Sequence, residues 1–252
     1  MFSTLKQNFR YAQAPHEIPA RLAKKGVVFN HFLISLHSQS VVKRMNRFPT
    51  KRRGGMLASY GVVGLLSLAL DVVRTRLAFQ GSRLLRRPFY LRGRRWIVLG
   101  KNFSCGRGLR MDALGDSSTT HPLIRIGSDV SMNDYVHIGA VESVSIGDRV
   151  LIASKVFISD HDHGSYGRGG IHSDPRIAPA ERPLSASPVV IEDDVWLGEF
   201  VSVLAGVRIG KGSIIGTMST VSRDIPPYCI AVGSPARVIK QFNFATGMWE
   251  KV

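Results

Sequence analysis

The chain has 252 residues, of which 44% are apolar, which is enough for a buried core and excludes a disordered or collagen-like chain. Its formal net charge of +16 is unevenly distributed. Residues 1–98 contain 19 of the 34 Lys and Arg residues and only two acids, Glu17 and Asp71, whereas residues 99–252 are close to neutral. The sequence therefore divides near Leu99 into a basic segment and a near-neutral remainder.

The cysteine content and the N-terminus indicate a reducing compartment. Two cysteines, Cys105 and Cys229, exclude a disulfide framework or a four-thiolate zinc site, and we expect both to be small buried side chains. The first 25 residues carry charges and prolines with no apolar segment between them, so a cleaved secretory signal is not expected. We therefore expect a cytoplasmic protein, which could lie peripherally on the inner face of the cytoplasmic membrane.

The basic segment contains one long uncharged stretch. Residues 54–70 carry no charge and lie between two arginine-rich runs. Three interpretations stay open: a helix on a membrane surface or capping the repeats, a true membrane span, or packing in an oligomer. We expect residues 1–98 to be partly helical and able to contact an anionic membrane surface, although a solvated arm would have the same composition. Nucleic-acid binding is not expected, because no nucleic-acid fold accompanies the charge.

A six-residue repeat fills the near-neutral part. From Ile191 the chain reads IEDDVW, LGEFVS, VLAGVR, IGKGSI, IGTMST and VSRDIP, with an aliphatic first residue and a small or aliphatic fifth residue in every hexad. The same register returns from Ile126 and Ile146 and, more weakly, from Leu99, which gives fifteen hexads. Neither the helix period of 3.6 nor the strand period of 2 produces this pattern.

The repeat predicts a solenoid. Each hexad would form one short strand whose first residue points inward and stacks on its equivalent one coil away. Glycine recurs at the second position, where we expect a turn with unusual backbone angles. We therefore predict an all-β parallel β-helix of about five coils over residues 99–241, followed by a C-terminal tail over residues 242–252. The largest interruption, residues 160–188, is expected to be a functional loop.

Three segments of the repeat region resemble a known family. They read ISDHDHG, SPVVIEDDVWLGEFVSVLAGVRIGKGSIIG and TVSRDIPPYCIAVGSPARVIK. They are similar to the maltose/galactoside O-acetyltransferase group of hexapeptide-repeat proteins, above all to those that O-acetylate lipopolysaccharide and capsule sugars. The resemblance covers about residues 83–244. It implies a left-handed β-helix, a homotrimer, acetyl-CoA as the acyl donor, a cell-surface saccharide as the acceptor that the loop 160–188 binds, and no metal.

The resemblance also implies the catalytic residues. In that group the catalytic base is the sixth residue of its hexad, which counted from Ile158 is His163, with His161 as the alternative. An imidazole that titrates near neutrality can remove the proton of an attacking hydroxyl. Asn133 matches an active-site Asn, although it could instead make a corner turn. The expected acceptor-binding residues are Asp134, Tyr135, Asp160 and Tyr166, with His137 as a weaker candidate for the same pocket.

The coenzyme A site is likewise implied by the resemblance. Trp196 would wall the acyl site, the GSPA turn would let the backbone approach the cofactor, and two arginines would bind the phosphates. The expected cofactor-binding residues are Trp196, Gly198, Ala205, Gly216, Arg223, Gly233, Pro235, Ala236 and Arg237.

Two other functions stay open. A zinc hydratase like γ-class carbonic anhydrase would need three histidines around one metal, and His161, His163 and His172 lie in one loop. A catalytically inactive, membrane-associated β-helix scaffold would bind no coenzyme A.

Overall fold

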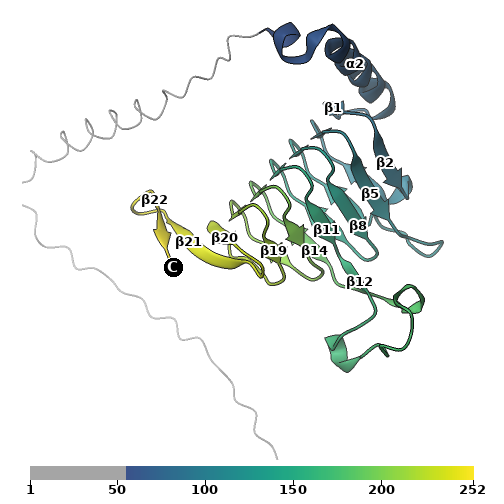
Figure 1. The fold of residues 1–252 in the computed structure, drawn as a ribbon, viewed down its shortest axis with the longest axis vertical. Coiled ribbons are helices and arrows are strands. Elements are labelled where there is room, and N and C mark those ends of the chain that lie inside the picture. The colour runs from purple at the N-terminus through teal and green to yellow at the C-terminus, as the bar shows by residue number, and fades with distance from the viewer. Residues whose placement is uncertain (1–54) are drawn as a thin grey trace, which may run out of the picture. The chain divides into compact units, whose positions relative to one another are not determined.

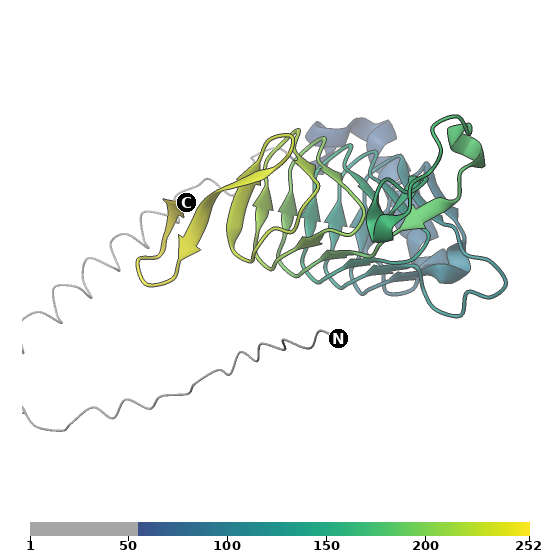
Figure 2. The ribbon, with the colours of Figure 1, turned by 90° about the horizontal axis from the view of Figure 1, so that it is seen from below.

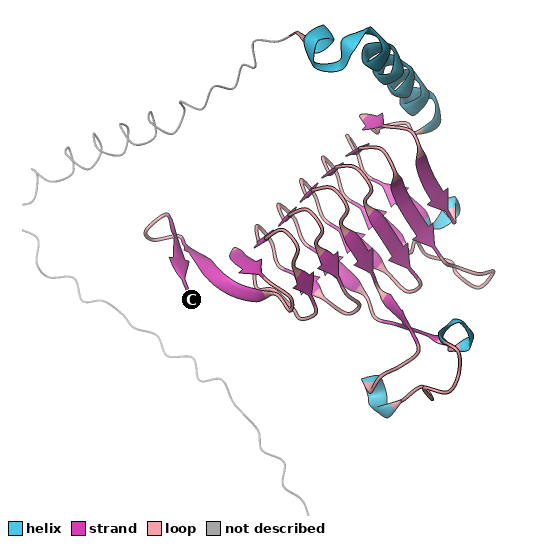
Figure 3. Cartoon of the chain, viewed as in Figure 1, coloured by secondary structure: helices cyan, strands magenta, loops and turns pink. Residues whose placement is uncertain are grey.

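The repeat region forms three parallel sheets that wind around one core. The computed structural model describes residues 55–252, so the expectations for residues 1–54 lie outside the described part of the chain. From Leu84 onward the chain visits the three sheets in turn (Figures 1 and 3). Sheet A runs β1 (Leu84–Leu85), β4 (Ser104–Cys105), β7 (Ser131–Met132), β10 (Leu151–Ile152), β15 (Trp196–Leu197), β18 (Ile214–Ile215) and β20 (Cys229–Val232). Sheet B, here in chain order, contains β2 (Phe89–Arg92), β5 (Leu109–Ala113), β8 (His137–Ala140), β11 (Phe157–Ser159), β16 (Ser202–Val203) and β19 (Thr220–Val221). Sheet C contains β3 (Ile97–Leu99), β6 (Ile124–Ile126), β9 (Val144–Ile146), β14 (Val189–Ile191) and β17 (Arg208–Ile209).

The first residues of the predicted hexads form the core as expected. In each sheet they are direct partners across successive strands, for example Ile126 with Ile146 and Ile146 with Ile191. Fourteen of the fifteen are buried, and Leu99 packs against the core from its edge. In the six hexads from Ile191 the fifth residues are buried as well, from Val195 to Ile225. The predicted inward stacking is confirmed, and burial of these aliphatic columns is the main force that holds the coils together.

The solenoid extends beyond the predicted boundaries at both ends. At its start, β1 and β2 pair in parallel with β4 and β5, so the coils begin at Leu84 instead of residue 99. Arginines and Pro88 mask the repeat there, although Leu85 is only 1% exposed. At its end, β21 (Arg237–Asn243) and β22 (Met248–Lys251) add antiparallel strands to β20. The expected tail is therefore part of a hairpin, which packs Phe242 against Trp249.

The second-position glycines have a different role from the predicted one. None of them has a positive φ; the left-handed conformation falls on the fourth position, as at Asp129, Arg149 and Lys155. A Cβ on Gly127 would lie 2.6 Å from the backbone carbon of Gly147 in the next coil. Glycine is therefore required because the corners of successive coils approach each other closely, and not because of its backbone angles.

The long insertion leaves the solenoid between β11 and β14. It begins and ends with an antiparallel pair, β12 (His161–His163) with β13 (Leu184–Ala186), and contains the short helical turns η2 (Arg168–Gly170) and η3 (Pro179–Glu181). It projects from one side of the coils (Figures 1 and 2). The antiparallel pair places both loop histidines beside sheet B.

A helix precedes the first coil. Helix α2 (Met56–Ala78) has a non-helical residue at Gly61, and a short turn η1 (Arg94–Trp96) follows β2. Within the described residues, Leu57–Ala78 is long and apolar enough to cross a membrane by length and composition, with a mean hydropathy of 1.5. Its C-terminal half is attached to the solenoid, because the Leu85 amide donates a hydrogen bond of 2.9 Å to Thr75 Oγ1.

Both cysteines are buried, as expected. Cys105 and Cys229 are each 2% exposed. Burial is the largest influence on the Cys105 thiol and raises its pKa to about 12, and burial also raises the pKa of the Cys229 thiol. Neither thiol is therefore expected to react in the folded protein near neutral pH.

The close approach of the corners predicts a stability effect. Gly127→Ala forces a methyl group against the backbone of Gly147, and we expect it to destabilise the fold by about 2 kcal/mol, which urea denaturation would measure. Gly55→Ala is the matched control, because a Cβ there meets nothing within 4 Å. Equal stability of the two variants would contradict the proposed reason for glycine at the corners.

Candidate active site

A pocket on the outward face of sheet B contains His161 and His163. Its volume is about 270 Å³, and we call it the histidine pocket. Four strands, β2, β5, β8 and β11, form its floor, and β12 forms one wall. Its lining residues are Arg92, Arg110, Asp112, Leu114, His137, Gly139, Phe157, Ser159, His161 and His163.

His161 is held in one orientation by a buried carboxylate. Its Nδ1 lies 2.9 Å from Asp160 Oδ1, and its side chain is only 15% exposed. An ionised carboxylate only accepts hydrogen bonds, so this contact requires the proton on Nδ1. The Nε2 lone pair is then available to take a proton from a molecule in the histidine pocket. This is the arrangement that a general base requires.

Asp160 is fixed in turn by the backbone of the neighbouring coil. Its carboxylate accepts hydrogen bonds from the amides of Val141, Glu142 and Ser143 at 2.7 to 3.1 Å, where the chain turns after β8. The side chain is completely buried. The predicted role of Asp160 in binding the acceptor is therefore wrong: the amides and His161 occupy its oxygens, and no surface is left for a ligand.

His163 lies in the same pocket without such a partner. Its side chain is exposed and has no hydrogen-bond partner among the described residues. Its backbone is held by pairing with Leu184 and by a hydrogen bond of 2.6 Å from the Tyr166 hydroxyl to its carbonyl. Tyr166 accepts a hydrogen bond from Arg182 within the loop and thus stabilises the loop itself. The geometry favours His161, the alternative base, over His163.

A second histidine–carboxylate pair lies beside the first. Asp112 Oδ2 accepts a hydrogen bond of 2.6 Å from Arg110 Nε and lies 3.1 Å from His137 Nε2. The sequence did not indicate Asp112, Arg110 or Arg92 as site residues. Asp112 could have been found from the repeat register, because it holds the same hexad position as Gly139 and Ser159 in the next two coils.

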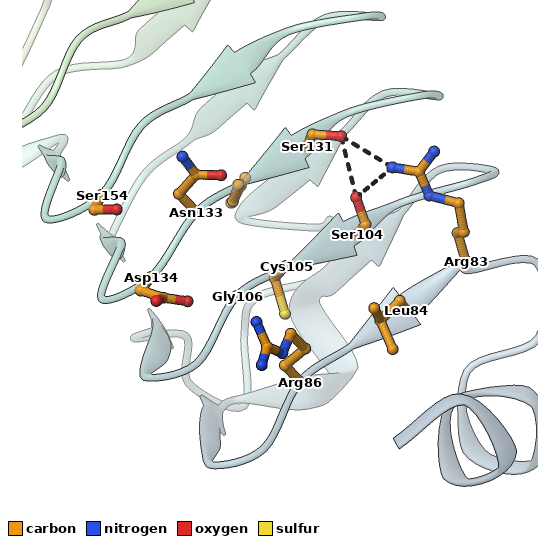
Figure 4. Close-up of a pocket in the computed structure, with 11 residues that line it drawn as sticks. Arg83, Leu84, Arg86, Ser104, Cys105, Gly106, Ser131, Asn133, Asp134 and Ser154 are labelled. Carbon is orange, nitrogen blue, oxygen red and sulfur yellow. Dashed lines mark hydrogen bonds between the residues drawn. The ribbon is translucent and has the colours of Figure 1, made fainter. Parts of the chain in front are cut away.

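Asn133 lies at a different corner of the solenoid. It follows β7 of sheet A, whereas the two loop histidines follow β11 of sheet B. With Asp134 it lines a second pocket of about 400 Å³ that also contains Arg83 and Arg86 (Figure 4). Tyr135 is the left-handed corner residue after them and is 60% exposed. One copy of the chain therefore does not bring Asn133 to His161.

Three of the residues expected to bind coenzyme A, Trp196, Gly198 and Gly216, lie at or beside the corner column of Asn133, whereas Ala205 and Arg223 follow strands of sheet B. Backbone hydrogen bonds link the corners of successive coils toward the C-terminus. The amides of Ala153, Gly198 and Gly216 donate to the carbonyls of Leu197, Ile215 and Ala231 in turn. Trp196 lies on β15 just before this corner and is 48% exposed. At the C-terminal end of the solenoid, the Gly233 carbonyl accepts a hydrogen bond from the Thr220 amide, and the Ala236 amide donates one to the Thr220 carbonyl. Arg223, Pro235 and Arg237 are exposed around this turn, whereas Ala205 and Ala236 are buried.

The loop histidines do not form a metal-ligand set. Within residues 55–252, no group of three or more His, Cys, Asp or Glu side chains is placed to hold a metal ion. His172 instead forms a backbone bridge with Tyr166 inside the loop. The convergence of histidines that a zinc hydratase would require is therefore missing from this part of the chain.

Comparisons with known proteins agree with the repeat. Residues 188–223 match the family model described as bacterial transferase hexapeptide (six repeats). WbbJ of Escherichia coli K12, named for O-acetyl transfer in lipopolysaccharide biosynthesis, is 45% identical over 192 residues, which cover 76% of this chain and 95% of WbbJ. The chain belongs to the hexapeptide-repeat acetyltransferases.

A further relative and a solved structure are similar to this chain. The galactoside O-acetyltransferase of Escherichia coli K12 is 37% identical over 120 residues, 48% of this acetyltransferase and 55% of that enzyme. A crystal structure of AntD, an N-acyltransferase from Bacillus cereus in complex with dTDP-4-amino-4,6-dideoxyglucose and coenzyme A, has the same fold. Its TM-score is 0.55 at 20% identity, over 69% of this chain and 91% of AntD. The family implies that the β-helix is left-handed, as expected.

The packing around His161 predicts a specific loss of acetyltransferase activity. A Cβ at Gly139 would lie 3.2 Å from His161 Cε1, so Gly139→Ala must displace the imidazole by a few tenths of an ångström. We expect kcat to fall about tenfold or more while the urea midpoint changes little. The matched control is Gly64→Ala in helix α2, where a Cβ is similarly crowded, at 3.1 Å from Tyr60 Cβ, and kcat should not change. An unchanged kcat in Gly139→Ala would contradict a catalytic role for the His161 ring position.

Proposed function

We propose that the protein transfers the acetyl group of acetyl-CoA to a hydroxyl of a cell-surface saccharide, with His161 as the general base. The observation that carries this proposal is the His161–Asp160 pair, whose free Nε2 belongs to the histidine pocket. Its relatives act as O-acetyltransferases, one named for a galactoside and one for lipopolysaccharide biosynthesis. A saccharide acceptor is the substrate class that both names share.

The proposed reaction is a direct transfer. Nε2 of His161 takes the proton of the saccharide hydroxyl as its oxygen attacks the thioester carbonyl carbon. The carbon–sulfur bond then breaks, and the imidazolium returns the proton to the departing thiolate. The products are an O-acetyl saccharide and free coenzyme A. Asp160 stabilises the imidazolium between the two steps without itself taking the proton.

The coenzyme A column and the base support a site shared between copies. Asn133, Gly198 and Gly216 lie at the corner after sheet A, and His161 lies at the corner after sheet B. A neighbouring copy that presents its sheet A corner to the histidine pocket would complete the site. We therefore include a homotrimer in the proposal, with the donor bound between copies.

Thiol release from acetyl-CoA tests the proposal. The protein is supplied with de-O-acetylated lipopolysaccharide, and its own thiols give little background because both are buried with raised pKa values. We expect saccharide-dependent release by the wild type, a loss of about 10²-fold or more in His161→Ala, and a change of less than about threefold in His163→Ala. The two histidines lie in the same pocket, so His163→Ala is a matched control.

Each other outcome is informative. Loss in His163→Ala alone would move the base to His163 and overturn the role of the buried pair. If the wild type neither releases thiol nor binds acetyl-CoA in calorimetry, the transferase proposal fails and the inactive scaffold is favoured.

A further inference from the structure

Helix α2 exposes a continuous row of large apolar side chains. They recur every third or fourth residue and are between 53% and 81% exposed. The row, here called the apolar stripe, consists of Val63, Leu66, Leu70, Val73 and Leu77. At 3.6 residues per turn these positions fall on one side of the helix. An exposed apolar row of this length indicates an interaction surface.

The opposite side of α2 is attached to the solenoid. Asp71 and Thr75 are 3% and 2% exposed, and Thr75 Oγ1 joins the two elements by donating to the Asp71 carbonyl and accepting from the Leu85 amide. The helix therefore cannot bury the stripe by rotating against the first coil. Within residues 55–252, the stripe faces away from the protein.

Positive charge surrounds the stripe. By helical position, Arg74 and Arg76 lie on its two sides, and Arg83, Arg86 and Arg87 follow the helix directly. Asp71, the one acidic residue between positions 55 and 98, is buried against the solenoid. The surface around α2 therefore presents cations without offsetting carboxylates.

We propose that α2 lies in the surface of an anionic bilayer, with the apolar stripe among the acyl chains and Arg74 and Arg76 at the lipid phosphates on its two sides. Because the packed side of α2 is opposite the stripe, the helix would lie along the membrane plane and hold the solenoid at its surface. This inference does not depend on the transferase activity.

A bilayer fits the stripe better than a second copy of α2 does. Two copies that paired through their stripes would bring Arg74 and Arg76 of each helix close together, with no exposed acid on either helix to offset them. Anionic lipid headgroups supply the opposite charge along the same line. The charge pattern therefore selects the bilayer.

Vesicle flotation of the full chain tests the proposal. Binding is compared between phosphatidylcholine vesicles and vesicles that also contain phosphatidylglycerol. We expect preference for the anionic vesicles, a loss of at least about tenfold in Leu66→Glu/Leu70→Glu, and a loss of at least about fivefold in Arg74→Gln/Arg76→Gln. The matched controls are Met248→Glu, an exposed apolar residue on β22, and Arg125→Gln/Lys251→Gln, which removes two exposed cations elsewhere. The basic residues 1–54 are present in every variant, and circular dichroism checks that each variant folds.

The outcomes separate the possible occupants of the stripe. Unchanged flotation of Leu66→Glu/Leu70→Glu overturns membrane binding by α2. Unchanged flotation together with dissociation of an oligomer, measured by light scattering, would assign the stripe to an interface between copies. Unchanged flotation of Arg74→Gln/Arg76→Gln would overturn the contact of these arginines with lipid phosphates.

Discussion

The chemistry of the site depends on one buried carboxylate. Asp160 is completely buried, and its charge is balanced by three backbone amides of the turn at residues 141–143 and by His161. Burial of a carboxylate is costly unless hydrogen-bond donors surround its oxygens, and these groups supply them. The same contacts hold His161 Nδ1 at Asp160, and the imidazole lines the histidine pocket. The position of the proposed base is therefore determined by the backbone of the preceding coil.

That backbone is held in place by the repeat. The aliphatic columns at the first hexad positions set the register between coils, so that Gly139 on β8 is the direct partner of Ser159 on β11. The turn after β8 thus reaches Asp160, and the missing side chain at Gly139 leaves space for the His161 ring. The sequence regularity that builds the solenoid also supplies the rigid frame that catalysis requires.

The repeat made most of the fold predictable, because the aliphatic residues that are buried recur at every sixth position of the sequence. The boundaries were less predictable, since Leu85 and Phe89 belong to coils whose pattern is masked by arginines. The predicted role of glycine at the corners was wrong, because contacts between coils are not visible in the sequence of one hexad. Contacts between coils also determine the site. His161 and Asp160 were recognised as candidates, but their roles depend on the Val141–Ser143 turn, which lies in the preceding coil.

The protonation state of the His161 ring tests this account most directly. Nitrogen NMR of histidine-labelled protein, with His161→Gln used to assign the signal, distinguishes the two neutral tautomers by their ring-nitrogen shifts. The account predicts that the neutral His161 ring carries its proton on Nδ1 and leaves Nε2 unprotonated. A neutral ring protonated on Nε2 would contradict the pairing with Asp160 and, with it, the assignment of His161 as the base.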